Sequence, residues 1–325
     1  MTVSYTPRLR RLYAATLLGL APVLVWAQDQ SPQTSVQPYE HVSPESSKEA
    51  VAILTHSTKP RMEEPARPKR RRIMHELDSV AGADEAPAFE GGQGEHPLMP
   101  ALRRAREGIK SIEKIQDYSA TVVKRERLFG KVGGYQYMFI KVRHKPFSVY
   151  TRFLAPDRFK GQECLYVEGQ NGGKMWAHGT GLEKKLFKTV SIAPDGPIAI
   201  RGQRYPLTEI GMLNLTCLLI QVAEQDINYG ECDVKFIEGA KINGRGCTVI
   251  QVVHPVPRRN FCFHLARIFI DDERNIPIRY EAYDWPEAPG KQPQLIEEYT
   301  YLNLKLNQGF ADKDFSRDNP NYEFR

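Results

Sequence analysis

Two arginines stand close together in the middle of the chain, where they could bind an anion. Arg201 and Arg204 come just before an apolar stretch that opens at Pro206 and is predicted to be a helix. The N-terminal N–H groups and the dipole of a helix attract negative charge. We therefore predict that Arg201 and Arg204 contact an anionic headgroup, a phosphate or a carboxylate. The alternative is that both arginines pair with nearby surface carboxylates.

A second group could bind a metal. His254, Cys262 and His264 are zinc-ligand types on successive predicted strands, and the Cys-x-His spacing puts two of them on one face of a strand. A structural zinc site needs four ligands, and no fourth is evident in the sequence. We predict no metal site and no other cofactor.

Carboxylates such as Glu297 and Glu298 could serve a glycosidase only if two acids stood roughly 5 to 10 Å apart. The sequence offers no means of placing them at that separation. A nucleophile elbow, a His-Glu-x-x-His helix and a glycine-rich loop opening a helix are all missing from the sequence. We therefore predict no catalytic residue, and an enzyme is the less favoured interpretation.

The start of the chain has the pattern of an export signal. Arg8, Arg10 and Arg11 precede an apolar run of 15 residues, 12–26, and Ala27 follows it. A permanent membrane helix needs roughly 20 apolar residues, so the run favours a signal peptide at 1–27, cleaved after Ala27, over a signal anchor. A periplasmic or secreted protein with no transmembrane segment in the mature chain is expected.

Residues 28–95 are rich in Ser, Pro, Glu, Ala and Gly and have few aromatic side chains, so we predict a disordered linker there and a folded domain at 96–325. The linker contains a basic run, Lys69 to Arg72. The net charge of +6 falls to +3 once the three signal arginines are removed. That charge is too small to indicate a nucleic acid partner.

Five cysteines, at positions 164, 217, 232, 247 and 262, make an odd number in a compartment that can be oxidising. They contain no Cys-x-x-Cys pair, and their pairing is left open. Cys217 lies within the apolar helical stretch and is predicted to be buried and inert.

Apolar positions recur at steps of three and four over 98–115, which predicts an amphipathic helix. A second helix, 206–225, is apolar nearly all round and is expected to be buried. Period-two alternation and turn residues predict strands at 118–129, 135–143, 147–153, 163–169, 174–178, 232–238, 247–254, 264–271, 278–284 and 295–306. The fold class is α+β: a strongly curved antiparallel sheet, an incomplete β-barrel, with a leading amphipathic helix and a buried helix.

This order of elements resembles the LolA-like superfamily of periplasmic lipoprotein carriers. The resemblance is carried by the strand and turn from Val167 to Trp176 and by the late strands around Ile268 to Asp271 and Ile276 to Tyr280. Three short sequence segments are similar to those of a secreted bacterial family known only as a domain of unknown function: Arg201 to Pro206, His254 to Pro257 and Tyr283 to Pro286.

The resemblance implies a non-enzymatic protein that holds a lipid or lipidated protein in the concavity of the incomplete barrel, with acyl chains as the ligand. An envelope protein is a second possible partner. The alternatives are a module that binds or senses an envelope polymer or protein, and a hydrolase of unknown substrate. We predict an apolar lining, which could instead be a solid core, made of Phe139, Phe153, Leu165, Trp176, Leu213, Ile220, Ile268 and Tyr280.

Overall fold

The computed structural model describes residues 84–89, 94–180 and 188–324. The expected signal peptide and most of the expected linker therefore lie outside the described residues. The described part of the linker includes an extended segment, 84–89, which packs on the domain: Ala88 bridges to Tyr229, and the N–H of Phe89 donates to the carbonyl of Asn228 at 2.8 Å. Packed structure thus begins ahead of the predicted boundary at residue 96.

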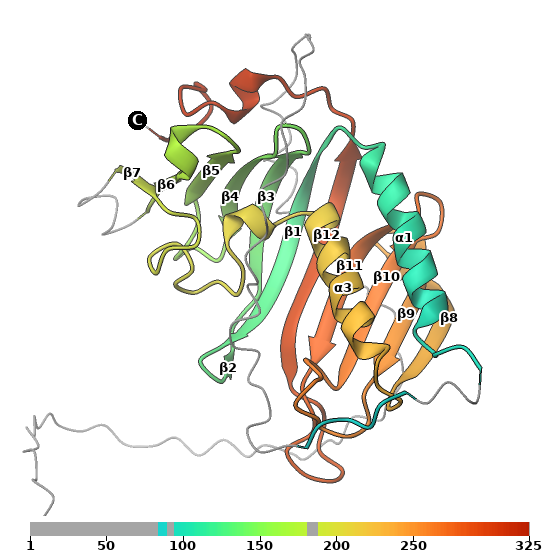
Figure 1. Cartoon of the computed structure of the whole chain (residues 1–325). Coiled ribbons are helices and arrows are strands. Elements are labelled where there is room, and N and C mark those ends of the chain that lie inside the picture. The colour runs from blue at the N-terminus through green and yellow to red at the C-terminus, as the bar shows by residue number, and fades with distance from the viewer. Residues whose placement is uncertain (1–83, 90–93, 181–187, 325) are drawn as a thin grey trace, which may run out of the picture. The chain divides into compact units, whose positions relative to one another are not determined.

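Within the described residues, the strands form one antiparallel sheet of 12 strands in the order β7-β6-β5-β4-β3-β1-β12-β11-β10-β9-β8, with β2 paired to β1 (Figure 1). The two end strands, β7 and β8, do not pair with each other, so the sheet does not close. The strands are β1 (Asp117–Leu128), β2 (Lys131–Val132), β3 (Gln136–Arg143), β4 (Ser148–Ala155), β5 (Glu163–Val167), β6 (Met175–His178), β7 (Thr189–Ile192), β8 (Asp233–Ile242), β9 (Arg245–Val253), β10 (Leu265–Asp271), β11 (Ile276–Tyr283) and β12 (Leu295–Leu306).

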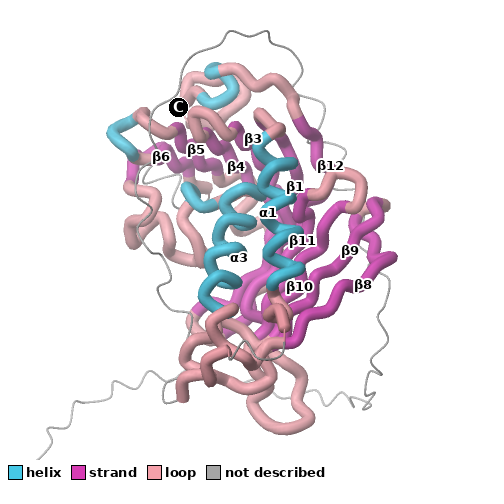
Figure 2. The backbone as a smooth tube through the Cα atoms, turned by 45° about the vertical axis from the view of Figure 1, so that its right-hand side comes forward, coloured by secondary structure: helices cyan, strands magenta, loops and turns pink. Residues whose placement is uncertain are grey.

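Two α-helices, α1 (Met99–Glu113) and α3 (Met212–Asp226), lie side by side on one face of this sheet (Figures 1 and 2). We call this the inner face. The amphipathic α1 packs on it through residues such as Leu102 and Ile112, which are buried. The predicted fold class, α+β with an open antiparallel sheet and two helices, is confirmed.

Strands β3 to β6 carry apolar side chains on both faces, because both of their faces are covered. On β3, Met138, Ile140 and Val142 join the core beneath the helices. Their alternating neighbour Phe139 packs instead in a second core with the C-terminal segment, which holds Phe315, Tyr322 and Phe324. A C-terminal tail, 307–324, thus covers the outer face over β3 to β6.

The tail is held to the sheet by charged and aromatic contacts. The buried Asp117 carboxylate accepts the backbone N–H groups of Gln308, Gly309 and Phe310, the last at 2.9 Å. The ring of Tyr322 stacks on Tyr150 with centroids 3.8 Å apart. These contacts order a segment that carries little regular structure beyond the short 3-10 helix Asp312–Phe315.

The second helix begins later than predicted. Pro206 has an extended backbone (ψ 157°), a 3-10 turn follows at Leu207–Glu209, and Gly211 at φ +114° precedes the first residue of α3, Met212. The backbone at Pro206 and Gly211 is not helical, so the apolar pattern that starts at Pro206 includes a connection as well as a helix.

Candidate functional site

An apolar space of about 70 Å³ lies between the two helices and the inner face of the sheet. We call it the apolar seam. Among its twenty lining residues, only Arg104, Thr216, Asp226 and Asn275 have polar side chains. The apolar ones come from α1 and its N-cap (Leu98, Ala101, Leu102, Ala105), from α3 (Leu219, Ile220, Val222, Ala223) and from the sheet side (Ile250, Val252, Phe263, Ala266, Ile268, Ile270, Pro277).

The helix α3 covers this seam without being buried itself. After the buried Met212, its large apolar side chains, including Leu213, Leu218 and Ile220, are only half-buried, whereas its buried positions include the polar Asn214 and Thr216. The expectation that this helix is buried nearly all round is therefore met only in part. Half-buried leucine and isoleucine side chains leave apolar surface in water, which costs about 25 cal/mol per Å².

A buried acid and histidine lie where α3 ends. Asp226 lines the seam, and its Oδ2 is 3.2 Å from Nε2 of His254, which is fully buried. The His254 ring stacks on Phe261 with centroids 3.8 Å apart. Within the described residues, no group of three or more His, Cys, Asp or Glu side chains is placed to hold a metal ion.

A buried charged cluster occupies the neighbouring part of the inner face. Ile268, Tyr280, Tyr299 and Lys124 stand opposite one another in a row across β10, β11, β12 and β1. Opposite residues in antiparallel strands share a face, so this row leads from the apolar seam to charged side chains. We define the cluster as Lys124, Glu126, Arg204, Tyr205, Glu297 and Tyr299.

Glu297 is the centre of that cluster. Arg204 Nε donates to its carboxylate at 2.9 Å and the Tyr205 hydroxyl donates at 2.9 Å. The hydroxyl of Tyr299 lies between two acids, 2.7 Å from Glu126 and 3.2 Å from Glu297. Burial raises the pKa of the Glu297 carboxyl, and the charge of Arg204 opposes that rise. This buried acid thus ties the connection that leads to α3 to the sheet.

The two arginines predicted to bind a headgroup have different surroundings. Arg204 is paired with Glu297 and also donates to the carbonyl of Arg127 at 3.2 Å. Arg201 is exposed in the connection ahead of α3. Because the helix starts at Met212, neither arginine adjoins its N-terminus, which removes the helix-dipole argument for this site.

The structure divides the predicted apolar lining among four places. Ile220 and Ile268 line the seam. Phe153 and Leu213 pack in the core nearer β3 and β4, and Tyr280 packs in the core next to the charged cluster. The other three, Phe139, Leu165 and Trp176, lie on the outer face with the tail, so the eight do not line one concavity.

Sequence reasoning missed most of the seam. The pattern over 98–115 showed the apolar face of a helix, which includes Leu98, Leu102 and Ala105, but not that this face lines a space. Phe263 lies just ahead of the predicted strand 264–271 and belonged to no predicted element. For the charged cluster a signal did exist. Every second residue of β1 from Ala120 onward faces inward. After Ala120 and Val122 this series continues with Lys124 and Glu126, so charged side chains extend an inward-facing apolar row.

All five cysteines are free thiols in the structure. Burial raises the pKa of Cys164 and Cys247 to about 11 and that of Cys232 and Cys262 to about 12. Cys217, predicted to be buried, is half-buried on α3.

These surroundings predict one reactive thiol. At pH 8 a thiol with a pKa of 11 or more is a thiolate in about one molecule in a thousand or fewer, and the thiolate is the nucleophile. We expect Ellman's reagent to modify Cys217 rapidly in the native protein and the other four only after denaturation. A fast phase that persists in Cys217→Ser would contradict this.

The fold and the site together define a class: an open single-sheet α+β domain whose two helices enclose an apolar seam beside a buried charged cluster. Within that class, the chain belongs to the family described as "Protein of unknown function (DUF1571)", whose model matches residues 115–324. The predicted membership of a domain-of-unknown-function family is thereby confirmed. No curated protein matches the chain in sequence.

Solved structures with a general likeness include three of bacterial proteins. The Mycobacterium tuberculosis lipoprotein LppX is 12% identical, with a TM-score of 0.38 over 66% of this chain and 98% of its own. A LolA superfamily protein from Nitrosomonas europaea is 12% identical, with a TM-score of 0.28 over 66% and 98%. The MucA/MucB complex of Pseudomonas aeruginosa is 14% identical, with a TM-score of 0.39 over 67% of this chain and 60% of its own.

In the described residues, no helix has both the length and the apolar character to span a bilayer.

Proposed function

We propose that this domain is a non-enzymatic carrier that takes up an acyl chain of a lipid or a lipidated protein in the apolar seam. The observation that carries the proposal is an apolar space beneath a covering helix whose apolar side chains, apart from Met212, are only half-buried. An inserted acyl chain removes its own surface and the exposed apolar surface of α3 from water, which stabilises the complex by about 0.8 kcal/mol per buried methylene.

Uptake requires the seam to widen. A cavity of about 150 Å³ holds one benzene molecule, whereas the seam has about 70 Å³. We assign the movement to the part of α3 after its first residue, because α1 is fixed by fully buried side chains such as Leu102 and Ile112, whereas in α3 only Met212 is a fully buried apolar side chain and the later ones lie partly in water. The seam is then a closed state that opens when a ligand enters.

The rest of the proposal concerns where the protein acts. We propose an exported protein, periplasmic or secreted, cleaved after Ala27, in which the part of the expected linker 28–95 that precedes the packed segment 84–89 lets the carrier reach acyl chains at a membrane surface. The charges at residues 8, 10 and 11 and the short apolar run after them support export. Sequencing the N-terminus of the protein recovered from its native envelope tests this part.

The carrier function can be tested by filling the seam. Ala223→Phe adds a ring on the seam side of α3, where Ala223 is a lining residue. We expect binding of a fluorescent C16 fatty acid to the full chain to weaken at least tenfold, because the ring occupies the space that the chain needs.

The matched control is Gln221→Phe, which adds the same ring on the same helix at an exposed position. We expect this variant to bind as the unmodified protein does. Absence of fatty-acid binding by the unmodified protein, or equal affinity in both variants, would show that the seam is not the binding site.

A further inference from the structure

A large aromatic side chain stands at the end of the hairpin that joins β1 to β2. Leu128 pairs with Lys131, so the turn between them has two residues, Phe129 and Gly130. Phe129 is 93% exposed, more than any other large apolar side chain in the described residues. Figure 1 shows β2 at the lower left of the sheet, apart from both helices. The fold thus leaves this ring in water.

The backbone at Phe129 does not suit a phenylalanine. Its φ is +51°, and that of Gly130 is +73°. A bulky side chain in this left-handed region is strained, and a two-residue turn with two positive φ angles prefers Asn-Gly. Among the described residues, every other non-glycine position with a positive φ is an asparagine, at 171, 243, 275, 303 and 307. The needs of the turn therefore do not explain Phe129.

Packing does not explain Phe129 either. Its ring belongs to none of the three clusters of packed apolar side chains that the described residues form. The fold gains nothing from a ring that is almost fully in water and sits on a strained backbone. Strained residues of this kind gather at functional positions, so we looked for a contact that this ring could make outside the chain.

The end of the hairpin combines apolar surface with one positive charge. We call residues 128–132 the hairpin tip. Leu128 and Val132 flank the turn and are half-buried, and Lys131 is exposed. Within the described residues Lys131 forms no ion pair, whereas the neighbouring Arg127 is paired with Asp284. The tip thus presents an exposed aromatic ring beside a single available cation, and it contains no acid.

A lipid bilayer matches this tip better than a protein partner does. A specific protein interface buries about 800 Å² on each side, whereas one aromatic side chain supplies about 150–250 Å². A bilayer needs no complementary shape. It takes up a projecting apolar side chain among its acyl chains, while a lysine next to that side chain extends its ammonium to anionic headgroups.

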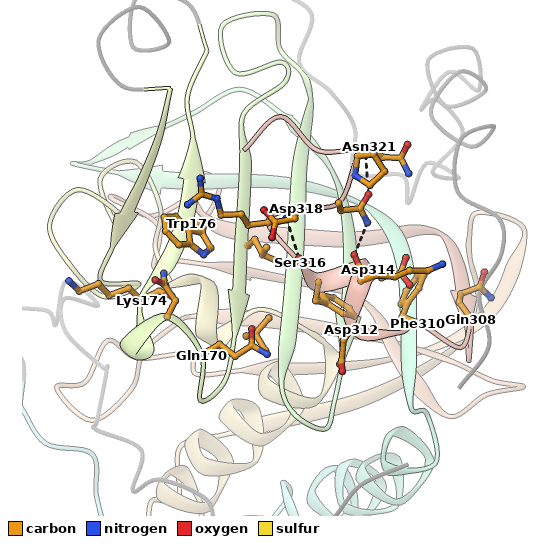
Figure 3. Close-up of a pocket in the computed structure, with 18 of the residues that line it drawn as sticks. Gln170, Lys174, Trp176, Gln308, Phe310, Asp312, Asp314, Ser316, Asp318 and Asn321 are labelled. Carbon is orange, nitrogen blue, oxygen red and sulfur yellow. Dashed lines mark hydrogen bonds between the residues drawn. The ribbon is translucent and has the colours of Figure 1, made fainter. Parts of the chain in front are cut away.

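The largest hollow of the domain is a poorer candidate for a contact. It is a groove of about 1030 Å³ on the outer face, between the β5–β6 region and the tail segment 308–321 (Figure 3). Its groups are engaged within the fold: Asp314 pairs with Lys141 at 3.0 Å, and the Arg317 guanidinium lies 4.5 Å from the ring centroid of Trp176. We assign this groove no ligand.

We propose that the hairpin tip is a membrane contact, in which the Phe129 ring inserts into a lipid bilayer and Lys131 binds anionic headgroups. The contact does not depend on acyl-chain uptake in the seam. Arg204, in the connection that leads to α3, donates to the carbonyl of Arg127 at 3.2 Å. Insertion of the tip therefore places this connection close to the membrane.

Insertion can be measured at the tip itself with Phe129→Trp, in the protein recovered from its native envelope. Vesicles of phosphatidylcholine with brominated acyl chains quench an indole that lies among those chains. We expect the fluorescence that this tryptophan adds to be quenched. The control is Phe236→Trp, because Phe236 is 44% exposed on the end strand β8, far from the tip in the order of strands. Its added fluorescence should not be quenched.

Phe129→Asn separates a membrane role from a structural one. Asparagine tolerates the left-handed backbone, so the melting temperature should stay the same or rise. Binding to phosphatidylcholine vesicles should weaken at least tenfold, because the apolar ring is lost. Phe236→Asn makes the same change on β8 and should leave vesicle binding unchanged. Lys131→Ser should weaken binding about fivefold, but only to vesicles that also contain phosphatidylglycerol.

Several results would overturn the proposal. These are an unquenched Phe129→Trp, unchanged vesicle binding by Phe129→Asn or by Lys131→Ser, and a clear fall in the melting temperature of Phe129→Asn. A dimer that sedimentation detects in the unmodified protein and not in Phe129→Asn, without vesicle binding, would assign the ring to a second copy of the chain. None of these results bears on fatty-acid binding in the seam, which Ala223→Phe tests.

Discussion

Replacing Glu297 by alanine is expected to lower the free energy of unfolding by about 3–5 kcal/mol, the usual cost of leaving one member of a buried ion pair without its partner. The change removes the acceptor of Arg204 and of the Tyr205 hydroxyl, both at 2.9 Å. Glu297 has only 3% of its surface exposed, so water cannot replace it well. Urea unfolding at pH 7 measures the loss.

The control for this variant is Glu224→Ala, which breaks an exposed pair between Glu224 and Arg106. Exposed pairs contribute about 0–1 kcal/mol, so Glu297→Ala should lose several times more unfolding free energy than Glu224→Ala. The double variant Arg204→Ala/Glu297→Ala should lose less than the sum of its single changes, because no charge is then left unpaired. Additive losses would contradict the pairing described here.

Gly211→Ala is expected to destabilise the protein by about 3 kcal/mol, from backbone strain and overpacking together. Gly211 has φ +114°, which side-chain-bearing residues rarely adopt, and a Cβ there would stand 2.9 Å from the hydroxyl oxygen of Tyr118. That hydroxyl accepts the N–H of Met212 at 3.1 Å, so the clash also disturbs the start of α3.

Gly202→Ala separates strain from the clash. Gly202 also has a positive φ, +85°, but a Cβ there meets nothing within 4 Å. We expect a loss of about 1 kcal/mol, from the left-handed backbone alone. Thermal unfolding of both variants measures the difference. Equal losses would mean that the close approach to Tyr118 does not matter.

Much of the secondary structure was predictable because it follows from local periodicity. The alternation over 118–129 predicted the strand found at Asp117–Leu128, and the Asn243-Gly244 pair has the positive φ angles, 50° and 77°, that a tight turn requires. Thr189–Ile192 was not predicted. Connections were also misjudged where an apolar run crossed from loop to helix at Pro206.

The candidate site was less predictable, because its members come together only across the sheet. Glu297 could be noticed as a carboxylate, but its partners Arg204 and Tyr205 are more than ninety positions away in the chain. Period-two alternation predicts that Phe139 and Ile140 point to opposite faces of the sheet. It does not predict which of the two faces the helices cover.

The sequence by itself determined the order of strands and helices, the family and the open antiparallel architecture, because each depends on patterns that neighbouring residues carry. The tertiary structure alone decided which face of β3 to β6 became the inner one, because the tail 307–324 covers the other face of these strands with apolar and charged contacts of its own. With both faces of these strands covered, an apolar residue on them is compatible with either face, and only long-range packing assigns it.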